Sequence, residues 1–154
     1  MCRVKIVRRP HGQTPLIYVL RCWCEDPDLS EQERLSVIRF LVEHGANVNP
    51  PGSESCGPLL YSRFAWYDSI FEYLLSCGAD PNPQMDGDPE TLFDWLIWEW
   101  RSEFFDVDEP EGSLEGEDDV DWLSCIAAKY GKPQPRILQM LKAAGEKRYS
   151  EHRQ

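Results

Sequence analysis

The sequence predicts an all-α fold built from a repeated helical unit, and the first observation behind this prediction is a pair of similar segments. Residues 36–49 and 69–82 each contain a glycine followed by Ala, by Asn or Asp, by a variable residue and by Asn. The two glycines, Gly45 and Gly78, lie 33 residues apart. Apolar residues stand eight, seven, four and three positions before each glycine, which is the spacing of one helical face: Val37, Ile38, Leu41 and Val42, and Ile70, Phe71, Leu74 and Leu75.

A third copy of the pattern ends at Gly145, 67 residues after Gly78. Ile137, Leu138 and Leu141 keep three of the four apolar positions, and Lys142 replaces the fourth. The last unit of a solenoid has nothing stacked on its outer face, so a polar residue is expected there. We therefore predict an α-solenoid of about three to four units of paired antiparallel helices, in which each glycine ends its helix with a left-handed turn.

Residues typical of helix starts predict where the remaining helices of the first two units begin. Pro15 follows Thr14, and Pro58 follows Gly57, which is the order of an N-cap and a first helical residue. A long acidic link containing Pro27 comes next in the first unit, and Ser30 with Glu33 has the spacing of a capping box. The second helix of that unit is therefore predicted to begin after Ser30.

The third region departs from the repeat. Asp88 and Pro89 predict a helix start, and large apolar residues follow as far as Trp100. They cover more than one helical face, so we predict a long helix buried on two sides. Composition favours the hydrophobic core for these side chains, and the alternative is an aromatic surface for a partner.

An acidic stretch follows this helix. Residues 106–117 hold many carboxylates with Pro110, Gly112 and Gly116, and we predict an exposed loop. A helix is then expected from Asp118 or Asp119 to about Lys129, ended by Gly131 and Pro133, with the last helix starting at Pro135. The third region is either one unit with a long insertion or two units of which the middle one has eroded.

The net charge of −11 is concentrated in one segment. Residues 86–121 contain fifteen acidic residues and one basic residue, Arg101, so the rest of the chain is slightly basic. A protein this acidic is a poor general binder of nucleic acid or of anionic membranes. If electrostatics guides an encounter, the expected partner is basic.

These residues together resemble the ankyrin repeat. The resemblance rests on Gly12-Gln13-Thr14-Pro15-Leu16, on the two endings 45–49 and 78–82, and on the 33-residue period, and it covers about residues 10 to 148 with gaps. It implies a single domain, 1–154, with repeats at about 10–49, 50–82 and 83–148 and an insertion at about 104–118. It also implies a scaffold for protein–protein interaction without catalysis of its own.

The resemblance further implies where a partner binds. Family partners dock on the tips between repeats and on the inner face of the first helices. The expected tip residues include Asn49, Asn82 and Asp86, and the expected inner-face residues are Tyr18, Tyr61, Arg63 and Trp66. The acidic segment adds Asp106, Asp108, Glu109 and Glu111 as candidates for contact with a basic partner.

Cofactor and catalytic signals are weak. The six cysteines are not paired at zinc spacing, and the three histidines do not flank them. No phosphate-binding loop, nucleophile elbow or zinc-protease motif occurs. We expect no cofactor, no catalytic residue and no metal site. No signal peptide or membrane span is evident, so a cytoplasmic location with reduced thiols is expected.

Three functions remain open from the sequence. The first is a binding protein that inhibits or adapts a basic protein partner, in the manner of a bacterial immunity protein that blocks a toxin, acting as a monomer or a heterodimer with that partner. The second is an acidic mimic of nucleic acid. The third is an enzyme with carboxylates in an acid/base or metal role, which a thermal shift with divalent cations tests.

Overall fold

The computed structural model describes residues 14–22, 28–50, 57–62, 66–83, 91–105 and 119–145. Over these residues the secondary structure is entirely helical, as predicted. The helices are α1 (Pro15–Cys22), α2 (Glu31–Glu43), α3 (Gly57–Tyr61), α4 (Asp68–Ser76), α5 (Leu92–Phe104), α6 (Asp119–Tyr130) and α7 (Arg136–Ala144). None of them is both long and apolar enough to cross a membrane.

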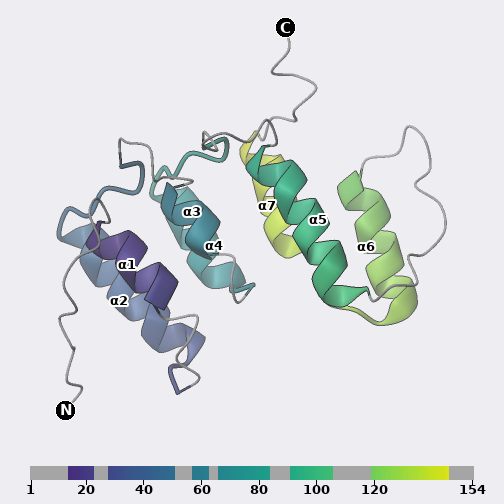
Figure 1. Ribbon diagram of the computed structural model, residues 1–154, viewed down its shortest axis with the longest axis horizontal. Helices are drawn as coiled ribbons and strands as arrows, with labels where there is room; N and C mark the ends of the chain where they lie inside the picture. The colour runs from purple at the N-terminus through teal and green to yellow at the C-terminus, as the bar shows by residue number, and fades with distance from the viewer. Residues whose placement is uncertain are drawn as a thin grey trace, which may run out of the picture.

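The helices stack in two layers (Figure 1). One layer contains α1, α3 and α5, and the other contains α2, α4 and α7. Within the second layer α2 packs on α4, and α4 packs on α7, although α5 and α6 come between them in the chain. In the third unit α5 therefore pairs with α7, and α6 lies at the far end of the stack.

The starts of α1 and α2 carry side-chain caps, whereas those of α4 and α7 have none. The Thr14 hydroxyl accepts a hydrogen bond from the Ile17 amide at 3.3 Å. Ser30 and Glu33 form the predicted capping box, in which the Glu33 amide donates to the Ser30 hydroxyl and the Ser30 amide donates to the Glu33 carboxylate at 2.9 Å. Each cap satisfies amides that have no partner inside the helix.

The predicted start of the third long helix is wrong. Asp88 and Pro89 lie outside the described residues, and α5 begins at Leu92 with Thr91 as its N-cap. Thr91 and Asp94 form a second capping box, in which each side chain accepts from the other residue's amide. This reciprocal pair satisfies two free amides, and it decides where the helix starts.

Burial on α5 also differs from the prediction. Leu92, Phe93, Leu96 and Trp100 are buried on one face, whereas the Trp98 side chain is 63% exposed. The helix is therefore not buried on two sides. Trp100 joins Phe71 and Phe93 among the largest side chains of the core, which runs through all the helix pairs.

The glycine turns agree with the prediction. Gly45, Gly78 and Gly145 have φ values of 91°, 83° and 86°, in the left-handed region that favours glycine. After the first two of these turns the amides of Ala46 and Ala79 return to the carbonyls of Leu41 and Leu74. Each turn thus closes its helix and directs the chain to the next unit.

The α6 helix changes the environment predicted for Lys142. Lys142 lies 3.6 Å from Asp121 of α6, and the Gln139 side chain donates to the Ser124 hydroxyl at 3.1 Å. Val120, Leu123 and Ala127 of α6 are buried. The outer face of α7, which was expected to be exposed to solvent, is therefore contacted by α6. Lys142 on this face pairs with the Asp121 carboxylate of α6.

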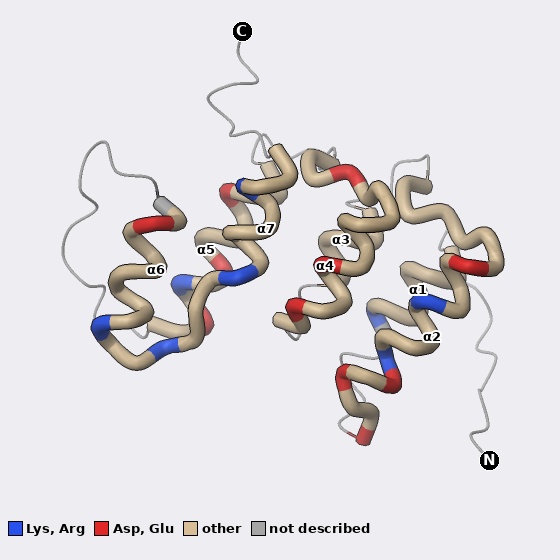
Figure 2. The backbone as a smooth tube through the Cα atoms, turned by 180° about the vertical axis from the view of Figure 1, so that it is seen from behind, with Lys and Arg blue, Asp and Glu red and all other residues tan. Residues whose placement is uncertain are grey.

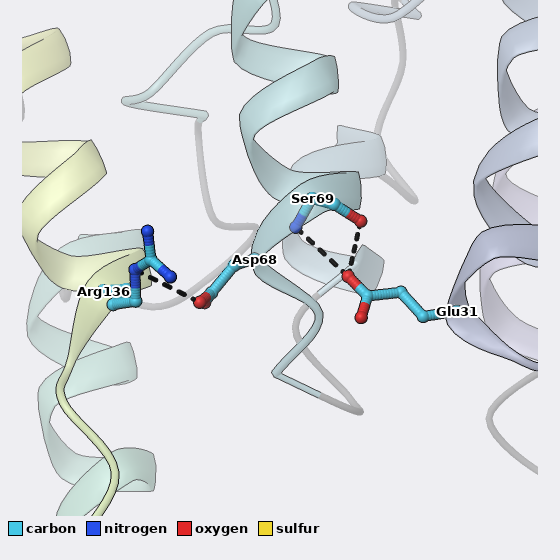
Figure 3. Close-up of polar contacts among 4 residues, drawn as sticks. All are labelled: Glu31, Asp68, Ser69 and Arg136. Atoms are coloured by element: carbon cyan, nitrogen blue, oxygen red, sulfur yellow. Dashed lines mark hydrogen bonds and ion pairs between the residues drawn. The ribbon is translucent and has the colours of Figure 1, made fainter.

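A polar seam joins the amino-terminal ends of the second-layer helices (Figure 3). The Glu31 carboxylate of α2 accepts hydrogen bonds from the amide and the hydroxyl of Ser69 on α4. On the other side of α4, Asp68 lies 3.4 Å from Arg136 of α7. The first residues of α2, α4 and α7 are thus linked in a row.

Two carboxylates of these helix starts are expected to shift stability with pH in opposite directions. Burial raises the pKa of Asp68, with Arg136 opposing and Glu31 and Glu72 adding to the rise. Its contribution to stability is present at low pH and is lost as pH rises from 3.8 through the folded pKa. Hydrogen bonds from Ser30 lower the pKa of Glu33, so its contribution is lost as pH falls below 4.5.

Denaturant unfolding of the wild type, Asp68→Asn and Glu33→Gln across the acid range measures this difference. Relative to Asp68→Asn, the wild type should lose stability as pH rises. Relative to Glu33→Gln, it should gain stability over the same rise. Slopes of the same sign for both variants would contradict the assignment.

Candidate functional site

The repeat tips hold the two asparagines expected to contact a partner. The Asn49 side-chain amide donates to the Gly78 carbonyl at 2.7 Å, and its carbonyl accepts from the Asp80 amide at 2.8 Å. Asn82 repeats the first of these contacts, donating to the Gly145 carbonyl at 3.0 Å. Each asparagine therefore joins its own tip to the glycine turn of the next unit, and contact with a partner stays a prediction for both.

The tips are also ordered internally. The amide of Asn49 donates to the Asn47 side chain at 2.9 Å, and the amide of Asn82 donates to the Asp80 side chain at 2.9 Å. These are Asx turns, which hold the backbone without a helix or a strand. The tips thus form a row of equivalent, exposed turns along one edge of the stack.

The inner-layer candidates lie on different helices. Tyr18 of α1 and Tyr61 at the end of α3 are half-buried, and the Arg21 guanidinium lies 5.5 Å from the Tyr61 ring centroid. Trp66 is also half-buried and has a φ of 51°, which is unusual for a residue other than glycine. Its ring lies 6.0 Å from Phe104 of α5, so Trp66 connects the second unit to the third.

An aromatic cluster surrounds the end of α5. Trp100 packs against Phe104 at 5.3 Å and against Phe105 at 5.6 Å between ring centroids, and Phe105 meets Tyr130 edge to face at 5.8 Å. Trp100 is 1% exposed and Tyr130 is 49% exposed. The cluster therefore reaches from the core to the surface at the point where the acidic connection leaves α5.

Other candidates cannot be located. Arg63, Asp86 and the acidic residues Asp106, Asp108, Glu109 and Glu111 lie outside the described residues. Phe105 precedes the acidic connection, and α6 follows it. We call residues 106–118 the acidic connection and the two elements that flank it in the sequence, α5 and α6, its anchors. These anchors lie toward the end of the stack farthest from α1 (Figure 1).

Charge on the described helices is mixed. Basic and acidic residues are spread over the stack (Figure 2), although α4 carries only the acidic Asp68 and Glu72 and α7 carries only the basic Arg136 and Lys142. Among the described residues there is no group of three or more histidine, cysteine, aspartate or glutamate residues that could hold a metal. Cys77 and Cys125 are free thiols.

Sequence reasoning did not single out several residues of these surfaces. Phe105 and Tyr130 were not predicted to meet, and Arg21, Arg34 and Arg39 were not predicted to stack on tyrosines of the following unit. The 33-residue period could have suggested the contact between Arg39 and Tyr73. Arg39 stands six residues before Gly45, and Tyr73 stands five residues before Gly78 in the next repeat.

Replacing Asn49 by alanine should destabilise the fold by about 1–2 kcal/mol, because two hydrogen bonds between units are lost. Asn47→Ala is the matched control, since it removes one hydrogen bond within the same turn. It should cost roughly half as much. Urea unfolding of both variants compares them, and equal losses would show that Asn49 acts only within its own turn.

The ankyrin repeat family model matches residues 11–53, which contain α1, α2 and the Gly45 turn. Alpha-latroinsectotoxin-Lt1a of Latrodectus tredecimguttatus is 37% identical over 67 residues, which are 43% of this chain. This chain spans only 4% of the length of that toxin. No solved structure matches the chain with significance.

The family match falls on the first unit, and the glycine ending of that unit recurs after 33 residues. The helices of successive units stack on one another in two layers. Residues 11–53 of this chain thus match the ankyrin repeat, and the period and the two-layer stacking of the later helices are consistent with further repeats of the same kind.

Proposed function

We propose that this chain is a non-catalytic module that binds a basic surface on a protein partner and inhibits or adapts that partner. Ankyrin repeats are typically binding modules for other proteins. The observation that carries the more specific proposal is the segregation of charge, with fifteen acidic residues and one basic residue between positions 86 and 121.

The placement of the anchors supports this proposal. The acidic connection starts from Phe105, which packs on Trp100 and Tyr130, and it returns to α6, which packs on α7. Both anchors are therefore held by side-chain packing at one end of the stack. A partner drawn to the acidic segment would meet the exposed edge of the aromatic cluster beside it, and aromatic side chains are frequent at binding hot spots.

The partner is expected to carry a concentrated positive field. An enzyme that acts on nucleic acid has such a field in its substrate cleft, and an acidic segment lying in the cleft would block it. This is the behaviour of an immunity protein toward a toxin, and we place it in the cytoplasm. Complementary fields raise association rates by about 10- to 1,000-fold.

Neutralising Asp106, Asp108, Glu109 and Glu111 to the corresponding amides tests the proposal. Affinity purification from the native source with mass spectrometry first identifies the partner. The variant should then associate at least about tenfold more slowly at low salt, with a flatter dependence on salt concentration. Stopped-flow or surface plasmon resonance measures both.

The matched control makes the same change in net charge elsewhere. Converting Asp28, Glu43, Glu72 and Glu151 to the corresponding amides removes four carboxylates outside residues 86–121. Its association rate should stay close to that of the wild type. If both variants slow equally, only total charge matters, and if neither slows, the acidic segment does not contact the partner.

A further inference from the structure

The outer face of α2 exposes two large apolar side chains. Val37 is 39% exposed and Phe40 is 56% exposed. They lie three positions apart on one side of the helix, together with Glu33 and His44, which are also exposed. The stripe 33, 37, 40 and 44 has the period of a single helical face. We call these four residues the α2 stripe.

The same positions are covered in the later units. Val37 stands eight residues before its glycine, and its equivalents Ile70 and Ile137 are 3% and 1% exposed. Phe40 stands five residues before its glycine, and its equivalents Tyr73 and Met140 are half-buried against the core. The α2 stripe therefore continues an interface that already exists twice in the fold.

The geometry of that interface is visible between α2 and α4. The Arg39 guanidinium of α2 lies 5.2 Å from the ring centroid of Tyr73. The position five residues before the glycine, Tyr73, thus receives the preceding helix of the second layer, and Ile70 at position eight is buried in the same unit. In the first unit no described helix packs on these positions, and they are occupied by Val37 and Phe40. The end of a solenoid that faces solvent is expected to carry polar residues instead.

The polar ends of the α2 stripe are complementary, because one carries a carboxylate acceptor and the other an imidazole ring. Glu33 lies at one end and His44 at the other, with Val37 and Phe40 between them. The Phe40 and His44 rings stack at 4.0 Å, and His44 Nδ1 lies 2.7 Å from the Phe40 carbonyl oxygen. The His44 ring is thus held beside Phe40. Two such stripes laid antiparallel bring each Glu33 opposite a His44 and each Val37 opposite a Phe40.

We propose that the α2 stripe is the docking site of a second copy of this chain, with the two α2 helices antiparallel about a two-fold axis. Such an isologous contact buries the same surface on both copies and closes the assembly at two. It goes beyond the proposed function, because α2 lies at the opposite end of the stack from α6 (Figure 1). A contact made by one helix per copy is smaller than the roughly 1,200–2,000 Å² of a standard interface, so the dimer is weak.

Sedimentation velocity of the full chain under reducing conditions, over about a hundredfold range of concentration, tests the proposal. The wild type should show a reversible monomer–dimer equilibrium. Phe40→Glu should weaken dimerisation by about tenfold or more, because it places carboxylates in the centre of the contact. Trp98→Glu is the matched control, since Trp98 is also an exposed aromatic residue but lies on α5. It should leave the dimerisation constant unchanged.

The charge pattern is tested separately at His44. His44→Lys places a cation opposite Glu33 and should retain the dimer, whereas His44→Glu places like charges together and should weaken it. Circular dichroism confirms that each variant is folded. A wild type that stays monomeric throughout, or a dimer that survives Phe40→Glu, would overturn the proposal. A loss caused equally by Trp98→Glu would also overturn it.

Discussion

The stacking of this protein depends on polar contacts that fix the register between neighbouring units at both ends of the second-layer helices. At the carboxyl ends, Asn49 and Asn82 donate to the carbonyls of the next glycine turns. At the amino ends, Glu31 accepts from Ser69, and Asp68 pairs with Arg136. Apolar packing alone permits a helix to slide along its neighbour, because it is not directional. Hydrogen bonds at the two ends select one position.

These contacts explain how α7 packs directly on α4, although α5 and α6 lie between the two helices in the sequence. Asn82 donates to the Gly145 carbonyl as Asn49 donates to the Gly78 carbonyl. At the amino ends, Asp68 forms an ion pair with Arg136 of α7, where Glu31 accepts hydrogen bonds from Ser69 of α4. The third unit therefore accepts α6 and the acidic connection between its two helices, because the contacts that define the unit lie on α4, α5 and α7. Insertions in loops cost little when the ends of the loop are held.

The two ends of the stack consequently differ. At the far end, α6 covers α7, and Lys142 and Asp121 compensate each other. At the near end, α2 keeps Val37 and Phe40 exposed at positions that are covered in the later units. One end is closed by α6, and the other exposes Val37 and Phe40 at repeat positions that are covered in the later units. The molecule thus presents two surfaces of different chemistry.

The fold class, the helix pairs and the glycine turns could be predicted because they depend on residues close together in the chain. The period of Gly45 and Gly78, the capping box of Ser30 and the prolines after Thr14 and Gly57 are local signals. The start of α5 was misplaced because Thr91 and Asp94 offered a better reciprocal cap than Asp88 and Pro89. Asn49 and Asn82 lie in the turns between units, but their hydrogen bonds to the next unit span 29 to 63 residues and leave no local pattern, and their contact with a partner stays a prediction.

The sequence by itself therefore determined that the chain is an all-α repeat protein with one acidic segment. Tertiary structure alone decided which helix covers which, that Trp98 faces solvent while Trp100 is buried, and that Lys142 meets Asp121. The physical reason is that helical periodicity specifies an apolar face but not its neighbour. The neighbour is chosen by packing and hydrogen bonds between residues that are distant in the chain.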